Sequence, residues 1–123
     1  MEQVRRITPA ERNEGAPTPG MIREEAVAND HTWAGFVRTE AGMVSGWHHH
    51  GAHETTFYVI SGTVRMESGP GGAEVTEAHA NDFVHVPAGL VHRESNPSQD
   101  ESQAIVFRAG SGPSVINVDG PAE

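Results

Sequence analysis

Four of the chain's eight histidines fall within six residues, in the stretch GWHHHGAHETTFYVISG from Gly46 to Gly62. They are His48, His49, His50 and His53, and Glu54 follows at once. Imidazole nitrogens suit the divalent transition metals, and carboxylate oxygens can complete such a ligand set. The stretch therefore indicates a metal site, and the question is which of these side chains can reach one ion.

The spacing of His48 and His50 identifies the first two candidate ligands. Successive side chains of an extended strand point to opposite faces, so His48 and His50 share a face and His49 points away. Two imidazoles at positions i and i+2 can reach one metal. One histidine alone would be better explained as a surface residue, but this pair is followed closely by further donors, which favours a metal.

A third ligand from this stretch is either His53 or Glu54. The following run, TTFYVI, predicts a strand whose inward side chains are Thr55, Phe57 and Val59. His53 shares that parity, whereas Glu54 would reach the interior only through a β-bulge. We favour His53 as the ligand and keep Glu54 as the alternative. If Glu54 does not bind the metal, it is the candidate general base.

A further ligand must come from another part of the chain. The stretch NDFVHVPAGLVHRESN, from Asn81 to Asn96, supplies His92 just after a PAG turn. Proline fixes one torsion of such a turn and glycine permits a tight corner. This places His92 at the start of a strand that could lie opposite the first cluster. His85 is a weaker candidate, better explained as a histidine that lines the pocket.

Together, the two stretches resemble the paired motifs of the cupin superfamily, G-x5-H-x-H-x3,4-E-x6-G and G-x5-P-x-G-x2-H-x3-N. The matching residues are Gly42, His48, His50, Glu54 and Gly62 in the first motif, and Pro87, Gly89, His92 and Asn96 in the second. The leading glycine of the second motif is replaced by Asn81. Seven residues rather than six separate Glu54 from Gly62, so the glutamate position falls on Glu54 or on Thr55.

The resemblance implies an all-β, single-domain jelly-roll barrel with a metal inside its open mouth. It implies His48, His50 and His92 as ligands, with His53 or Glu54 as the fourth. We expect one divalent transition metal per chain, which could be Fe, Mn, Ni, Cu or Zn. Cupins include dioxygenases, isomerases, decarboxylases and ligand-binding proteins. We therefore expect an oxygenase for a small organic substrate; the alternatives are a non-catalytic binding or sensing module and a barrel that binds no metal in the cell.

The elements that would position these residues are short strands. The 123 residues fit one domain, with a polar arm at 1–20, the barrel at 21–118 and a tail at 119–123. Alternating apolar patterns between glycine- and proline-rich turns predict strands at 21–28, 32–39, 43–50, 55–60, 63–68, 73–78, 82–87, 90–95, 103–109 and 114–118. Many short strands at near-even spacing favour a barrel or jelly roll.

Composition narrows the classes of partner and location. The net charge of −9 disfavours nucleic acid and anionic membranes as partners. The chain has no cysteine, no apolar leader and no long apolar run, so we expect a cytoplasmic protein. An apolar fraction of only 36% favours burial of further surface in a homodimer. The strand predicted at 21–28 would offer its edge to the second subunit.

Overall fold

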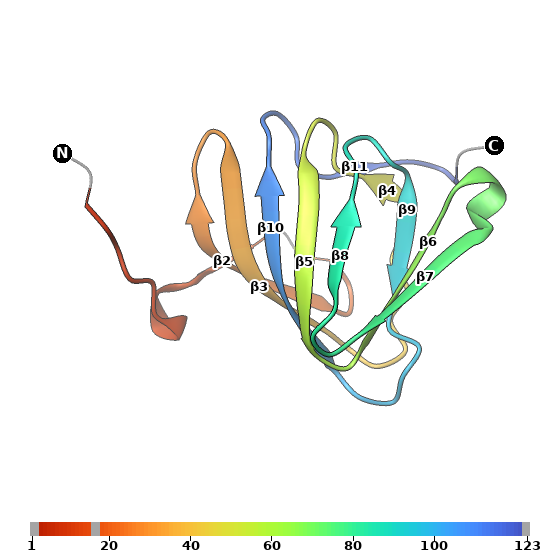
Figure 1. Cartoon of the computed structure of the whole chain (residues 1–123), viewed down its shortest axis with the longest axis horizontal. Helices are drawn as coiled ribbons and strands as arrows, with labels where there is room; N and C mark the ends of the chain where they lie inside the picture. Colours follow the sequence, from red (N-terminus) through yellow and green to blue (C-terminus); the bar gives the residue numbers. More distant parts are fainter. Residues whose placement is uncertain (1–2, 16–17, 122–123) are drawn as a thin grey trace.

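The computed structural model describes residues 3–15 and 18–121, which form two antiparallel sheets packed face to face (Figure 1). The strand order is β1-β2-β3-β10-β5-β8 in a six-stranded sheet and β11-β4-β9-β6-β7 in a five-stranded sheet. Within the described residues no ladder joins the two sheets. The predicted all-β jelly roll is therefore confirmed, with the correction that it is a sandwich and not a closed barrel.

Most strands lie where the sequence predicts them. The six-stranded sheet contains β1 (Asn13–Glu14), β2 (Met21–Ala28), β3 (Thr32–Thr39), β10 (Ser102–Ala109), β5 (Glu54–Ser61) and β8 (Phe83–Val86). The five-stranded sheet contains β11 (Ile116–Asn117), β4 (His48–His49), β9 (His92–Ser95), β6 (Thr63–Ser68) and β7 (Glu74–His79). The strand predicted at 43–50 is shorter than expected: only β4 and a bridge between Val44 and Ser95 form. Two 3-10 helices, η1 (Pro9–Glu11) and η2 (Pro70–Gly72), complete the described elements, among which no helix is long and apolar enough to cross a membrane.

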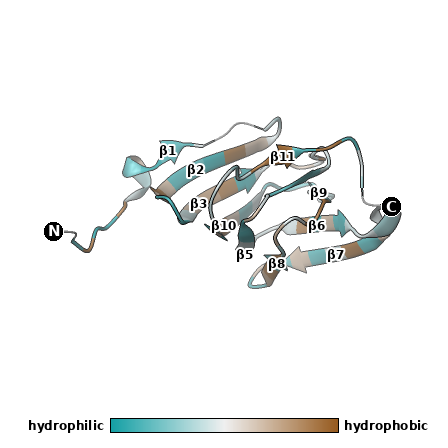
Figure 2. Cartoon of the chain, turned by 90° about the horizontal axis from the view of Figure 1, so that it is seen from above, coloured by the Kyte–Doolittle hydropathy of each residue, from teal (hydrophilic) through white to brown (hydrophobic). Residues whose placement is uncertain are grey.

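The core lies between the two sheets, which Figure 2 shows from above as two layers. Strand β5 illustrates the alternation that builds it, because Thr55, Phe57 and Val59 are buried as predicted. The buried apolar cluster draws on both sheets and consists of Met21, Val37, Met43, Phe57, Val59, Val64, Met66, Ala78, Val84, Val86, Ala104 and Val106. Burial of this apolar surface is the main force that holds the sheets together.

The N-terminal arm is partly folded onto the sandwich. Its strand β1 pairs with β2, with Asn13 opposite Glu25 and Glu14 opposite Glu24. Part of the β2 edge that we expected to meet a second subunit is thus covered by the chain itself. The domain boundaries at residues 20 and 118 stay predictions, and the predicted tail at 119–123 extends beyond the described residues.

Two asparagines of the second cupin-like motif have structural explanations. Asn81 replaces the motif's glycine and has a φ of +78°, the only positive φ of a non-glycine residue in the described chain. Asparagine tolerates this left-handed conformation better than most residues do. Asn96 is fully buried beyond the end of β9, where its side-chain amide donates to the carbonyl oxygens of Thr39 (3.2 Å) and Asp100 (2.8 Å).

Candidate metal centre

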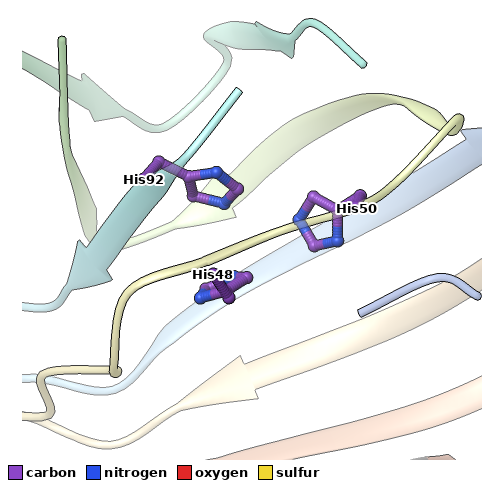
Figure 3. Close-up of side chains that lie close together, drawn as sticks. All are labelled: His48, His50 and His92. Atoms are coloured by element: carbon purple, nitrogen blue, oxygen red, sulfur yellow. The ribbon is translucent and has the colours of Figure 1, made fainter. Parts of the chain in front are cut away.

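Three histidine side chains meet inside the sandwich, between the two sheets. His48 on β4 and His92 on β9 are directly opposite each other in the antiparallel pair, and His50 follows two residues after His48. One ring nitrogen from each lies within 4.8 Å of the others, and Figure 3 shows the three rings gathered around a common space. All three residues are at most 5% exposed. The structure therefore brings together three of the four predicted ligands.

Main-chain carbonyl groups fix the orientation of these rings. In each ring, Nδ1 lies at hydrogen-bonding distance from a carbonyl oxygen; the pairs are His48 with Gly46 (2.9 Å), His50 with Ser114 (2.7 Å) and His92 with Leu90 (2.9 Å). A carbonyl oxygen can only accept, so Nδ1 carries the proton and Nε2 keeps a lone pair. The His48 Nε2 is buried with no hydrogen-bond partner among the described residues. Metal-binding histidines typically donate the hydrogen of their other ring nitrogen to a carbonyl or carboxylate oxygen in this way, so the three residues fit a metal.

The surroundings favour neutral rings. Burial lowers the pKa of His50 to about 3, and the nearby positive charge of Arg108 acts in the same direction. Burial likewise lowers the pKa of His92. Imidazole must be neutral to bind a metal, so both rings are in the competent state at neutral pH.

His53 and His49 lie outside the group of three. His53 is buried, as its parity predicts, but its Nε2 donates to the Gly112 carbonyl oxygen at 3.0 Å. Its Nδ1 is buried with no hydrogen-bond partner in the described chain. His53 as a fourth ligand stays a prediction. The Nδ1 of His49 accepts a hydrogen bond from the Gly51 amide at 3.0 Å.

Glu54 points to the outer face of the six-stranded sheet. Its side chain is 53% exposed, and its Oε2 lies 2.8 Å from the Nε2 of His85, which is itself 58% exposed. The register pairs Thr56 with His85 across β5 and β8, which places Glu54 beside that pair on the outer surface. The role of Glu54 as ligand or general base stays a prediction, and its carboxylate has an outward partner instead.

The carboxylate beside the histidines belongs to Glu94, which the sequence reasoning missed. Its Oε1 lies 3.8 Å from the His48 Nε2, and its side chain is 19% exposed. Glu94 follows His92 by two residues on β9, so the two side chains share a face. The same i, i+2 rule that paired His48 with His50 could have identified it.

A cavity of about 40 Å³ lies beside the histidines, and both sheets line it. The five-stranded sheet contributes His92 and Glu94, and the six-stranded sheet contributes Thr55, Arg23 and Arg108. The Thr55 hydroxyl, at the alternative glutamate position of the motif, is buried and has no hydrogen-bond partner among the described residues. A larger cavity, of about 200 Å³, also reaches His92. Small molecules therefore have space next to the imidazole group.

Comparison with known proteins supports this fold. The profile of the Cupin domain family matches residues 35–108, which include all three clustered histidines. No curated protein gives a significant match. The solved structure of KdgF from Halomonas sp. is similar with a TM-score of 0.70 at 21% identity, covering 86% of this chain and 94% of that one.

Two further solved structures are similar. A conserved protein with a double-stranded β-helix domain from Klebsiella pneumoniae has a TM-score of 0.69 at 21% identity, covering 85% of this chain and 90% of that one. A mutant of the oxalate decarboxylase OxdC from Bacillus subtilis has a TM-score of 0.72 at 18% identity, covering 86% of this chain and 30% of that one. At such identities the likeness shows the fold alone.

Proposed function

The chain belongs to the cupin family, and we propose that it is a metal-dependent oxygenase that acts on a small organic substrate in the cavity. The observation that carries this proposal is the convergence of His48, His50 and His92, each with its Nδ1 held by a carbonyl group. A divalent metal bound there would act as a Lewis acid at which oxygen and substrate can meet.

The arrangement of ligands and cavity supports a reactive site over a purely structural one. Three protein ligands leave coordination positions open for small molecules, whereas a structural metal is usually enclosed by four. Here His50 and His92 also line the cavity, so a metal held by the three histidines would border space that a substrate can enter. Of the similar structures, oxalate decarboxylase from Bacillus subtilis is described with Mn(II) centres, which supports manganese as one of the metals to test.

Proton handling in this site falls to Glu94. Its carboxylate lines the cavity and lies 3.8 Å from the His48 Nε2, whereas Glu54 is paired with His85 on the outer face. A general base must come within hydrogen-bonding reach of the proton that it removes. Glu94 can meet that requirement for a substrate that lies against the three imidazoles.

The test begins with elemental analysis of protein purified without a metal-affinity step. We expect one transition metal per chain, and oxygen uptake with some member of a panel of enols, thiols and catechols. Oxygen uptake should disappear in His92→Ala. A chain that carries no metal under any loading condition would overturn the proposal.

A non-catalytic binding or sensing module is the second candidate. It would follow if Glu94 does not act as a base, because Glu54, the general base predicted from the sequence, lies on the outer face. One metal per chain with ligand binding but no turnover would support this alternative over the oxygenase.

We also propose a homodimer, which buries the outer face of the six-stranded sheet. Neighbouring strands place Ile105, Tyr58 and Phe83 side by side on that face, and Phe83 is 73% exposed. Exposed apolar patches often mark protein–protein contacts. Small-molecule partners, the exclusion of nucleic acid and membranes, and a cytoplasmic location stay predictions.

A further inference from the structure

The wall of the cavity that faces the histidines contains two buried positive charges. Arg23 on β2 and Arg108 on β10 are only 7% and 6% exposed. Both line the cavity with His50, His92 and Glu94. A buried guanidinium group is costly unless a partner satisfies it, so the pairing of Arg108 decides what this wall of the cavity can bind.

Arg108 packs against an aromatic side chain but is incompletely paired. Its guanidinium carbon lies 4.8 Å from the centre of the Trp33 ring, directly across the β3–β10 pair. The Trp33 indole nitrogen is fixed in turn by a 2.8 Å hydrogen bond to Glu25. The Nε of Arg108 is buried with no hydrogen-bond partner, and within the described chain no carboxylate lies within 4.0 Å of its guanidinium. The side chain is thus positioned before any ligand arrives.

Arg23 adds a second guanidinium to the same wall. Its Nη1 donates to the Thr18 hydroxyl at 2.7 Å, which orients the group. Burial lowers the pKa of Arg108 to about 10, and the nearby charge of Arg23 acts in the same direction. Arg108 therefore remains charged at neutral pH.

The lining of the cavity has more positive than negative side chains. The guanidinium groups of Arg23 and Arg108 line it together with a single carboxylate, that of Glu94. A divalent metal on the histidines would add further positive charge. The cavity is therefore positive within a chain whose net charge is −9, and it suits a ligand that supplies negative charge.

We propose that the cavity binds a short-chain carboxylate, whose carboxylate group is held by Arg108 beside Arg23, opposite the three imidazoles. The planar guanidinium group matches the two oxygens of a carboxylate. The volume of about 40 Å³ holds roughly three water-sized groups, and Met21, Val37 and Val106 give it apolar walls. Phosphate would fit these walls less well than a carboxylate with a short carbon chain. The inference rests on the proposed function in that it names the ligand class of the same cavity.

The test uses formate, acetate and propionate as probes, with acetamide as the neutral analogue of acetate and inorganic phosphate as the alternative anion. Binding is followed on the whole, metal-free protein through the arginine Nε–H signals in nuclear magnetic resonance spectra, where the Arg108 signal is identified by its loss in Arg108→Gln. We expect the carboxylates to shift this signal and to bind at least tenfold more tightly than acetamide. Equal binding of acetate and acetamide, or tighter binding of phosphate, would overturn the proposal.

Two variants locate the interaction. Arg108→Gln should weaken carboxylate binding at least tenfold, and Arg108→Lys should weaken it less because it keeps the charge but loses the planar fork. The matched control is Arg38→Gln, which removes the same charge from the neighbouring strand β3, where the side chain is 37% exposed. Equal effects of Arg108→Gln and Arg38→Gln would contradict the assignment. The comparison of carboxylate with amide in the wild type holds even if Arg108→Gln does not fold.

Metal content measured on the same samples separates this proposal from the proposed function. Stoichiometric metal without carboxylate binding would overturn the carboxylate site and leave the metal centre standing. Carboxylate binding that depends on Arg108 in a protein that takes up no metal would overturn the metal centre alone.

Discussion

The two walls of the cavity are built in different ways. The histidine wall is the group of His48, His50 and His92, of which His50 and His92 line the cavity. It lies on the side of the five-stranded sheet, where β4 has only two residues and carbonyl groups orient each ring. The arginine wall belongs to the six-stranded sheet, where β2 and β10 each run for eight residues. Arg108 is braced there by an aromatic side chain of the neighbouring strand.

The difference shows how each wall gains its precision. Short strands leave main-chain carbonyl groups free of the sheet ladder, and these can orient imidazoles for a metal. Long strands use up their carbonyl groups in the ladder, so a buried charge must be held by other side chains. We infer that the histidine wall is specialised for a metal and the arginine wall for the charge of the ligand.

The histidine wall should lose its metal completely when one of its imidazole rings is removed. His48→Ala and His92→Ala should each abolish stoichiometric metal, because the two remaining imidazoles leave the centre incomplete. Elemental analysis of the purified variants measures this effect. His49→Ala is the matched control and should keep the wild-type metal content, since His49 lies outside the group. Loss of metal in His49→Ala but not in His50→Ala would contradict the assigned ligands.

The next largest effect should show which carboxylate supports the metal on the histidine wall. Glu94→Gln should lower metal affinity by about 10- to 100-fold, because this carboxylate lies beside His48. Glu54→Gln should leave the affinity unchanged, since Glu54 is paired with His85 on the outer face. Competition with a chelator of known affinity measures both variants. A loss in His53→Ala that equals the loss in His92→Ala would establish the four-histidine set.

Acid should destabilise the histidine wall even without a metal. An unfolded histidine takes up its proton near pH 6.5, whereas the folded His50 does so only near pH 3. The stability contributed by keeping His50 neutral is thus present above pH 6.5 and declines as the pH falls toward 3. The free energy of unfolding of the metal-free protein should drop by about 2 kcal/mol by pH 5 through this residue alone. Urea denaturation at pH 7.5 and 5 measures it, and an equal drop in His50→Gln would show that His50 is not responsible.

A substitution on the outer face of the six-stranded sheet should change the oligomeric state without affecting either wall of the cavity. Phe83→Ser should weaken the proposed dimer, because Phe83 is 73% exposed and lies beside Tyr58, with ring centres 5.0 Å apart. Light scattering should give about twice the chain mass of 13.2 kDa for the wild type and a lower value for the variant. A wild-type value near the chain mass at micromolar concentration would exclude the dimer.

The sequence predicted the histidine wall better than the arginine wall, for physical reasons. His48, His50 and His92 are readable because rare residue types recur at fixed spacing near turns. The pattern of strand β10 predicts the wrong buried face, because its bulkier apolar side chains, Ile105 and Phe107, point outward and are 37% and 50% exposed.

The inward positions of β10 are small or charged, so its hydrophobic pattern suggests the wrong face. Ala104, Val106 and Arg108 are the buried residues there. Glu94 was missed because a charged residue on a short strand looks exposed. The packing of the two sheets decides which charged and metal-binding side chains meet in the cavity. The local pattern of one strand does not encode that packing.

Asn96 has a consequence for how the protein moves. It lies four residues beyond His92, just past the end of β9, so the main-chain atoms of the two residues are about 13 Å apart. There it holds together β3, the loop that follows β9 and the segment that precedes β4, through hydrogen bonds with Thr39, Asp100 and Met43. We therefore expect the two sheets to separate first near His48, His50 and His92. The amide hydrogens of Gly42 and Asn96 should exchange with solvent among the last in the chain.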